Sequence, residues 1–119
     1  MHAYLIDPFT QTITQVEYSG DYQEIYKLTD CDTFTCVGIN EFGDTVFVDD
    51  EGLINGKQQE FFMIANYPDP LAGKGLVLGT DDEGDSVSPS ITLEQLKAQV
   101  DWVPSIFQMK IERYFPEPK

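Results

Sequence analysis

The chain has 119 residues, of which 41% are hydrophobic and 13% aromatic; this is enough to build one domain with its own core and too apolar for a disordered chain. Twenty-one acidic residues oppose seven basic ones, and the resulting net charge of −14 repels nucleic acids and anionic membranes while it attracts basic protein surfaces. No segment approaches the ~18 consecutive apolar residues of a membrane helix, and the first residues lack the pattern of a signal peptide, so we expect a cytoplasmic protein that contacts no membrane.

The N-terminal part of the chain predicts a β-hairpin followed by a short helix. Residues 3–6 form an apolar strand that stops before Pro8, because proline has no N–H to donate to a neighbouring strand. Residues 12–18 are rich in β-branched side chains, which favour a second strand, and residues 7–11 are then the hairpin connection. Residues 22–28 carry apolar side chains at helical spacing behind a group of capping residues.

The middle of the chain predicts a second hairpin. Residues 33–39 alternate between the two faces of a strand, and residues 45–48 form a β-branched strand that pairs back across a turn at 40–44. Two further turn signals follow at 49–52 and 55–56, because acidic residues, asparagine and glycine favour tight turns. Short connections of this kind favour antiparallel pairing.

The C-terminal part predicts two short buried segments and a further helix. Residues 61–64 and 76–78 are apolar, and prolines hold a loop open between them. Residues 81–90 form the most loop-like stretch of the chain. Residues 92–100 carry a helical apolar stripe behind a Ser/Thr cap.

The tail at residues 103–115 fits two structures. Its apolar residues alternate with polar ones, as in a strand, but they also recur at helical spacing after Pro104, a residue that suits the first turn of a helix, and we favour the helix. Pro116 and Pro118 indicate a frayed end from about residue 116. Together the elements predict the fold class α+β: a single domain over residues 1–119, with a mainly antiparallel sheet and two or three short helices.

The two cysteines, Cys31 and Cys36, fit a reducing compartment. Only His2 is available to complete a zinc site with them, so we expect no metal and no other cofactor. We expect both cysteines to be unbridged thiols, buried as small hydrophobic residues beside a strand.

Residue types that carry catalysis are scarce. His2 is the single histidine and lies at the terminus, and Arg113 is the single arginine, which leaves no pair of guanidinium groups for a phosphorylated substrate. Neither a Ser-His-Asp nor a Cys-His arrangement is expected from this supply. We therefore predict that the chain is not an enzyme and assign no catalytic residue.

The sequence Asp-Asp-Glu-Gly occurs twice, at residues 49–52 and 81–84, each time after an apolar strand. Oxygen-rich loops hold Ca²⁺ or Mg²⁺, and Asp85 adds a further carboxylate to the second loop. Neither loop has the ligand spacing of an EF-hand, whereas acidic residues followed by glycine are favoured in hairpin turns. We interpret both as turns and expect no metal site.

A glycine-flanked segment offers a different kind of site. Gly73, Lys74, Gly75 and Gly79 surround a short apolar strand, but their spacing differs from that of a phosphate-binding loop and no hydroxyl residue follows Gly-Lys. Tight turns and close backbone packing explain these glycines more simply. A small-ligand, nucleotide or metal-binding domain that uses this segment is an alternative function.

Five stretches of the chain carry a resemblance to a known family: the strand ending in Asp7-Pro8, the helix opened by Gly20-Asp21, the block at 49–56, Ala72-Gly73 leading into 76–79, and a helix headed by Thr92. Over residues 3–102 they resemble an uncharacterised domain-of-unknown-function family that is common in bacteriophages, plasmids and conjugative elements. Members usually carry Asn-Glu-Glu-Gly in the third stretch and an Asn-Arg pair after it; this chain has Asp-Asp-Glu-Gly and then Gln58-Gln59-Glu60, so no ligand role is carried over to that position. The resemblance implies a small accessory protein of a mobile element in the host cytoplasm, and it implies no activity.

Charge is the remaining guide to function. Residues 1–56 hold eleven acidic residues and a single basic one, Lys27. We predict an acidic accessory protein that occupies a basic surface of a host protein, with carboxylates in the place of nucleic-acid phosphates and no direct binding to nucleic acid. The simplest competing explanation is that the charge only keeps a small protein soluble.

A second alternative function is a structural role in an oligomeric phage assembly, with Phe61 and Phe62 or the aromatic tail as the interface. For the leading prediction, the candidate partner-binding carboxylates lie in and beside the predicted turns: Asp44, Asp49, Asp50, Glu51, Asp81, Asp82, Glu83 and Asp85.

Overall fold

The computed structural model describes residues 1–31, 33–49, 60–65 and 67–103. Two helices lie within these residues, α1 (Gln23–Thr29) and α2 (Leu93–Gln99). The strands are β1 (His2–Asp7), β2 (Thr12–Glu17), β3 (Phe34–Gly38), β4 (Thr45–Asp49), β5 (Phe61–Ile64), β6 (Leu71–Ala72), β7 (Gly75–Thr80), β8 (Ser86–Val87) and β9 (Val100–Trp102).

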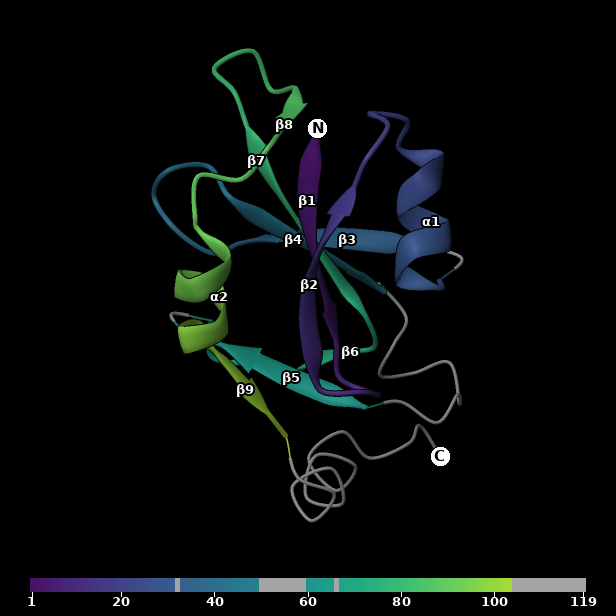
Figure 1. Cartoon of the computed structure of the whole chain (residues 1–119), viewed down its shortest axis with the longest axis vertical. Coiled ribbons are helices and arrows are strands. Elements are labelled where there is room, and N and C mark those ends of the chain that lie inside the picture. Colours follow the sequence, from purple (N-terminus) through teal and green to yellow (C-terminus); the bar gives the residue numbers. More distant parts are fainter. Residues whose placement is uncertain (32, 50–59, 66, 104–119) are drawn as a thin grey trace, which may run out of the picture.

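The strands form two sheets, and every strand pair is antiparallel. The main sheet has the order β2-β1-β7-β4-β3, with β8 pairing onto the end of β7; the smaller sheet has the order β6-β5-β9. Figure 1 shows the strands of the main sheet crossing the middle of the molecule, with β5 and β9 at the end opposite the β7–β8 turn. The predicted α+β domain with a mainly antiparallel sheet is confirmed.

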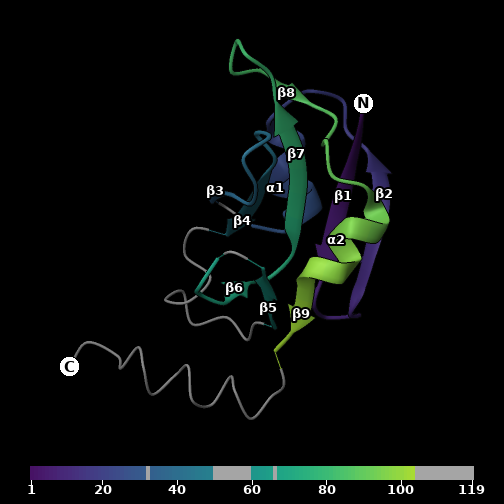
Figure 2. The same ribbon diagram turned by 90° about the vertical axis from the view of Figure 1, so that its left-hand side faces the viewer.

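Strand β7 lies at the centre of the main sheet and separates two clusters of core residues. Leu76 and Leu78 point to one face, where they pack with Ile25 of α1. Val77 points to the other face, where it joins the cluster that contains Leu96 of α2 and Phe62 of the smaller sheet. Both faces are therefore covered, and α1 and α2 lie on opposite sides of the strands in Figures 1 and 2.

The first hairpin forms as the sequence predicts. β1 and β2 pair along their whole length, from His2 opposite Glu17 to Asp7 opposite Thr12. A carboxylate oxygen of Asp7 accepts hydrogen bonds from the backbone N–H groups of Phe9 and Thr10, which closes the connection as an Asx turn.

Both predicted helices are present, and their ends have local causes. At α1, Asp21 accepts a hydrogen bond from the Gln23 N–H, and Asp30 ends the helix with a left-handed backbone, φ 55°. At α2, Thr92 and Gln95 form a capping box in which each side chain accepts a hydrogen bond from the other residue's backbone N–H.

Some predicted boundaries are wrong. The loop expected at 81–90 contains β8, and the helix expected over 92–100 ends at Gln99, because Val100 has extended backbone and opens β9 beside β5. The tail at 103–115, for which the sequence favoured a helix, and the frayed end from about 116 lie outside the described residues, apart from Val103.

Two predictions of burial are also wrong. Cys31 is buried, but Cys36 is exposed on β3, the strand at the edge of the main sheet. Phe62 is fully buried in the core, as the predicted buried segment at 61–64 requires, so the alternative that used Phe62 as an exposed interface residue is wrong. No disulfide joins Cys31 and Cys36, as predicted.

Within the described part of the chain, no helix is long and apolar enough to cross a membrane.

Candidate functional site

Several connections of the main sheet meet at one end. β4 begins at Thr45, opposite Leu78 near the end of β7, and β1 begins at His2, beside the end of β2. Because the neighbouring strands are antiparallel, the β3–β4 turn, the β7–β8 turn and the β2–α1 connection all leave the sheet at this end. The first two turns are in close contact: a Cβ atom added to Gly43 would lie 2.9 Å from the carbonyl oxygen of Thr80.

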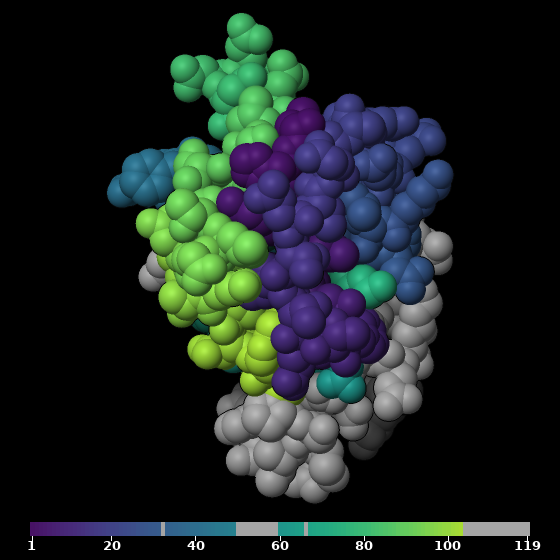
Figure 3. Space-filling model, viewed as in Figure 1, coloured from purple at the N-terminus to yellow at the C-terminus, as the bar shows by residue number. Residues whose placement is uncertain are grey.

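Carboxylates gather at this end of the sheet, which we call the acidic end. Among the described residues, the ion pair formed here joins the Met1 ammonium group to Glu17, 3.8 Å apart. Figure 3 shows the β7–β8 turn projecting from the top of the molecule, so its carboxylates reach well into solvent. The acidic end comprises the exposed Glu17, Asp21, Glu41, Asp81, Asp82, Glu83 and Asp85, with the half-buried Glu24.

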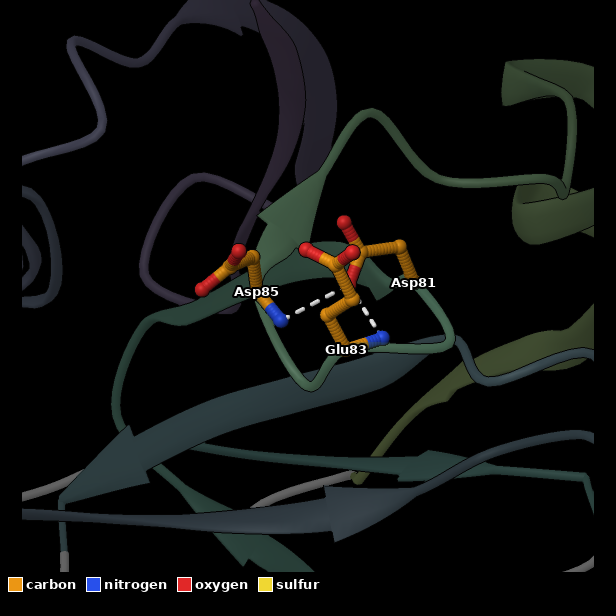
Figure 4. A group of neighbouring side chains, drawn as sticks. All are labelled: Asp81, Glu83 and Asp85. Atoms are coloured by element: carbon orange, nitrogen blue, oxygen red, sulfur yellow. Dashed lines mark hydrogen bonds between the residues drawn. The ribbon is translucent and has the colours of Figure 1, made fainter.

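The turn from β7 to β8 is held by one of its own carboxylates. An oxygen of Asp81 accepts hydrogen bonds from the N–H groups of Glu83 and Asp85, each 2.9 Å long (Figure 4). The Asp81 and Asp85 backbones also bond to each other, and Gly84 supplies the positive φ of 86° that the turn requires. The interpretation of the second Asp-Asp-Glu-Gly as turn chemistry is therefore confirmed.

The same turn brings three carboxylates together. Oxygens of Asp81, Glu83 and Asp85 all lie within 4.8 Å of one another, and all three side chains are exposed. Calcium needs about six to eight oxygen ligands, and one of the Asp81 oxygens already accepts two backbone hydrogen bonds. Among the residues that the structure describes, these three exposed carboxylates form no enclosed metal site, and their negative charges, close together on one turn, make it strongly electronegative.

A groove of about 430 Å³ lies beside the turn, between it and the start of α1. Aromatic side chains form much of its wall, and two of them, Phe34 and Phe47, pack edge to face with their ring centres 5.5 Å apart. We call this the aromatic groove; the lining residues that matter below are Met1, Tyr18, Tyr22, Phe34, Phe47 and Asp85.

The field of the acidic end reaches into the aromatic groove. Burial raises the pKa of the Tyr18 hydroxyl above its ordinary value of 10.0, and the nearby carboxylates of Glu24 and Asp21 raise this pKa further. Asp85 reaches the groove from the opposite wall. Carboxylates on both sides of the aromatic groove therefore contribute negative potential to it.

A second hollow, of about 400 Å³, lies between β2 and α2. The described residues of its wall include Lys97 and Trp102 and no carboxylate. An aromatic wall together with an acidic rim thus distinguishes the aromatic groove from this second hollow.

The structure removes Asp44 from the candidate carboxylates. Its side chain is fully buried, because it accepts hydrogen bonds from the N–H groups of Ser90 and Ile91, both 2.8 Å long, and from the side-chain amide of Asn40. Asp44 therefore ties the β3–β4 turn to the chain before α2, and the prediction that it contacts a partner is wrong.

Asp49, the residue of the first acidic run that the structure describes, is not at the acidic end. Asp49 is half-buried at the last position of β4, whose first residue, Thr45, lies at the acidic end. Asp50 and Glu51 lie outside the described residues. The structure brings together Asp81, Asp82, Glu83 and Asp85 from the predicted set.

The glycine-flanked segment is packed inside the protein. A Cβ atom on Gly75 would lie 2.8 Å from Val46 Cγ2, and one on Gly79 would lie 2.7 Å from the Ser88 carbonyl oxygen. Gly73 has a positive φ of 78° in the turn before β7, and Lys74 is half-buried. These glycines permit close backbone packing, and the segment lines neither of the two hollows.

Sequence reasoning missed half of the acidic end and the whole aromatic groove. Glu17, Asp21, Glu24 and Glu41 lie far apart in the chain, but antiparallel hairpins return alternate connections to the same end of a sheet. The shared end of these connections could therefore have been predicted together with the hairpins. The groove could not, because its aromatic residues have the same spacing as core residues.

Comparisons with known proteins identify the family. The model of the domain of unknown function DUF3846 matches residues 1–101. The chain is also 34% identical over 94 residues to the uncharacterized protein y4iR of Sinorhizobium fredii (strain NBRC 101917 / NGR234); the match covers 77% of this chain and 57% of that protein, so the chain spans little more than half the length of this relative. No solved structure matches. The chain belongs to the DUF3846 family of domains of unknown function.

Proposed function

We propose that this chain is a non-enzymatic binding protein that places its acidic end on a basic surface of another protein. The observation that carries the proposal is the convergence of three connections, and with them the carboxylates of the acidic end, at one end of the main sheet. A net charge of −14 adds long-range attraction to a basic partner and repulsion from nucleic acid.

The setting we propose is that of an accessory protein of a bacteriophage, plasmid or conjugative element, acting on a host protein in the host cytoplasm. The resemblance seen in the sequence supports this setting. A basic groove that normally binds nucleic acid is the most suitable target, because exposed carboxylates on a projecting turn can take the positions of phosphates.

Capture from host lysate tests the proposal. The chain carrying Asp82→Asn, Glu83→Gln and Asp85→Asn loses three charges from the β7–β8 turn but keeps Asp81, which holds the turn together. A control carrying Asp69→Asn, Glu94→Gln and Asp101→Asn loses three exposed charges elsewhere.

We expect the unmodified chain and the control to capture the same basic proteins at low salt and to release them at high salt, while the turn variant captures markedly less. Equal capture by all three proteins would refute a role for the acidic end and leave solubility as the function of the charge.

A further inference from the structure

We infer that the aromatic groove receives an arginine side chain of the protein partner, so that the acidic end attracts the partner and the groove anchors it. This inference rests on the proposed function and names the contact at its centre.

The first observation is the position of the groove. It lies between the β7–β8 turn and the start of α1, and Asp85 belongs both to the carboxylate group of the turn and to the groove wall. A partner drawn to the turn by its charge therefore meets the groove without a further movement.

The second observation is the nature of the wall. Tyr22 is 59% exposed and begins a row of four rings, of which Tyr22, Phe34 and Phe47 line the groove. The ring centres of Tyr22 and Tyr26 are 6.4 Å apart, those of Tyr26 and Phe34 are 4.8 Å apart, and the row ends at Phe47. Aromatic faces attract cations, and the attraction strengthens where water is partly excluded.

The third observation is the charge around the rings. Asp85 stands on one side of the groove, and the carboxylates of Asp21 and Glu24 lie close enough to Tyr18 on the other side to act on its hydroxyl. Among the described residues that line the groove, the Met1 ammonium group is the opposing charge, and it already contacts the Tyr18 carbonyl oxygen and Glu17. The groove therefore attracts a cation and disfavours an anion.

These features favour arginine over lysine. A guanidinium group is planar, stacks on aromatic faces and is more weakly hydrated than an ammonium group, and its donors fit a carboxylate in pairs. A volume of about 430 Å³ is near the lower end of the ~300–1,000 Å³ that ligand pockets span, which suits one or two side chains of a protein partner.

The test is an NMR titration of the full chain with three probe peptides: acetyl-Gly-Ser-Arg-Ser-Gly-amide, the same peptide with lysine, and the same peptide with citrulline, a neutral shape analogue of arginine. We expect the arginine peptide to shift the backbone signals of Tyr22, Phe34 and Asp85 saturably, the lysine peptide to bind more weakly, and the citrulline peptide to leave them unshifted.

The Tyr22→Ala variant should weaken arginine-peptide binding by roughly three-fold, the size of a partly exposed cation–π contact. Asp85→Asn should weaken it by a similar factor, whereas Asp101→Asn, far from the groove, should not.

A longer peptide, made of six Arg-Ser repeats, separates this inference from the proposed function. If the longer peptide binds at the β7–β8 turn but Tyr22→Ala has no effect and the groove signals stay unshifted, the groove inference is wrong and the proposed function stands. If no basic peptide binds at low salt, both fail. Tighter binding of free arginine than of the arginine peptide would also overturn the inference, because it would indicate a small-molecule ligand.

Discussion

At the scale of single residues, the same residue type has opposite roles in this chain. Asp44 and Asp82 both follow turn signals and look alike in the sequence, yet one is fully buried and the other is exposed. The difference arises from two N–H groups, of Ser90 and Ile91, which come from a segment more than forty residues away. Local pattern cannot reveal a partner at that separation, and this is why the sequence placed Asp44 on the wrong surface.

Removing Asp44 should destabilise the fold. Asp44→Ala leaves the buried N–H of Ile91, the partly buried N–H of Ser90 and the Asn40 amide without their acceptor, and we expect the free energy of unfolding to fall by about 2–4 kcal/mol. Asp44→Asn keeps part of the acceptor capacity and should cost less. Urea unfolding measures both, with Asp82→Ala as the exposed control; a loss for Asp44→Ala no larger than that of the control would contradict the role assigned to Asp44.

Tyr18 should make stability depend on pH in the alkaline range. Its pKa is raised in the folded protein by burial and then by Glu24 and Asp21, so the unfolded chain releases this proton at a lower pH than the folded chain does. The contribution is present below the ordinary pKa of 10.0 and is lost as pH rises from there through the folded pKa. Unfolding measured from pH 8 to 11 should therefore show a steeper loss of stability for the unmodified chain than for Tyr18→Phe. Parallel curves would count against the assignment.

At the scale of elements, the sequence predicts those that are governed by their own residues. The Thr92 cap, the hairpin connection at 7–11 and the hairpin pattern of β1 and β2 depend on neighbours in the chain, and they form as expected. β8 and β9 are short: β8 pairs with its neighbour β7 across the turn, whereas β9 exists because the distant strand β5 offers it hydrogen bonds. The order β2-β1-β7-β4-β3 places a C-terminal strand between two N-terminal hairpins, and no local signal encodes that insertion.

The close packing around β7 gives a prediction at this scale. Gly75→Ala places a methyl group 2.8 Å from Val46 Cγ2 and 2.9 Å from Phe62 Cζ, side chains that are themselves fully buried. We expect a loss of about 1–3 kcal/mol from overpacking, measured by thermal or urea unfolding. Gly38→Ala is the matched control, since nothing lies within 4 Å of the added atom on the edge strand β3. Equal stability of the two variants would show that the core around β7 is looser than described.

At the scale of the whole molecule, charge and topology combine. The sequence shows that the chain is strongly acidic, and it places four of the relevant residues on the β7–β8 turn. It does not show that the β2–α1 connection and the β3–β4 turn add their carboxylates at the same end, or that an aromatic groove lies between the β7–β8 turn and the start of α1. That part of the candidate site depends on strand order, which is a property of the complete fold.

The rate of association with a basic probe tests the central claim most directly. Rim charges act chiefly on the association rate and on its dependence on salt. We would measure stopped-flow association of a labelled arginine–serine repeat peptide, at several salt concentrations, with the unmodified chain, the turn variant (Asp82→Asn, Glu83→Gln, Asp85→Asn) and the control variant (Asp69→Asn, Glu94→Gln, Asp101→Asn). The two variants carry the same net charge, so a difference between them reports the position of the charge and not its amount.

The account predicts that the turn variant associates about three- to ten-fold more slowly than the control at low salt, with a flatter dependence on salt concentration, and that all three proteins converge at high salt. If the two variants instead associate at the same rate across the whole salt series, the acidic end has no special role and the proposed function is contradicted.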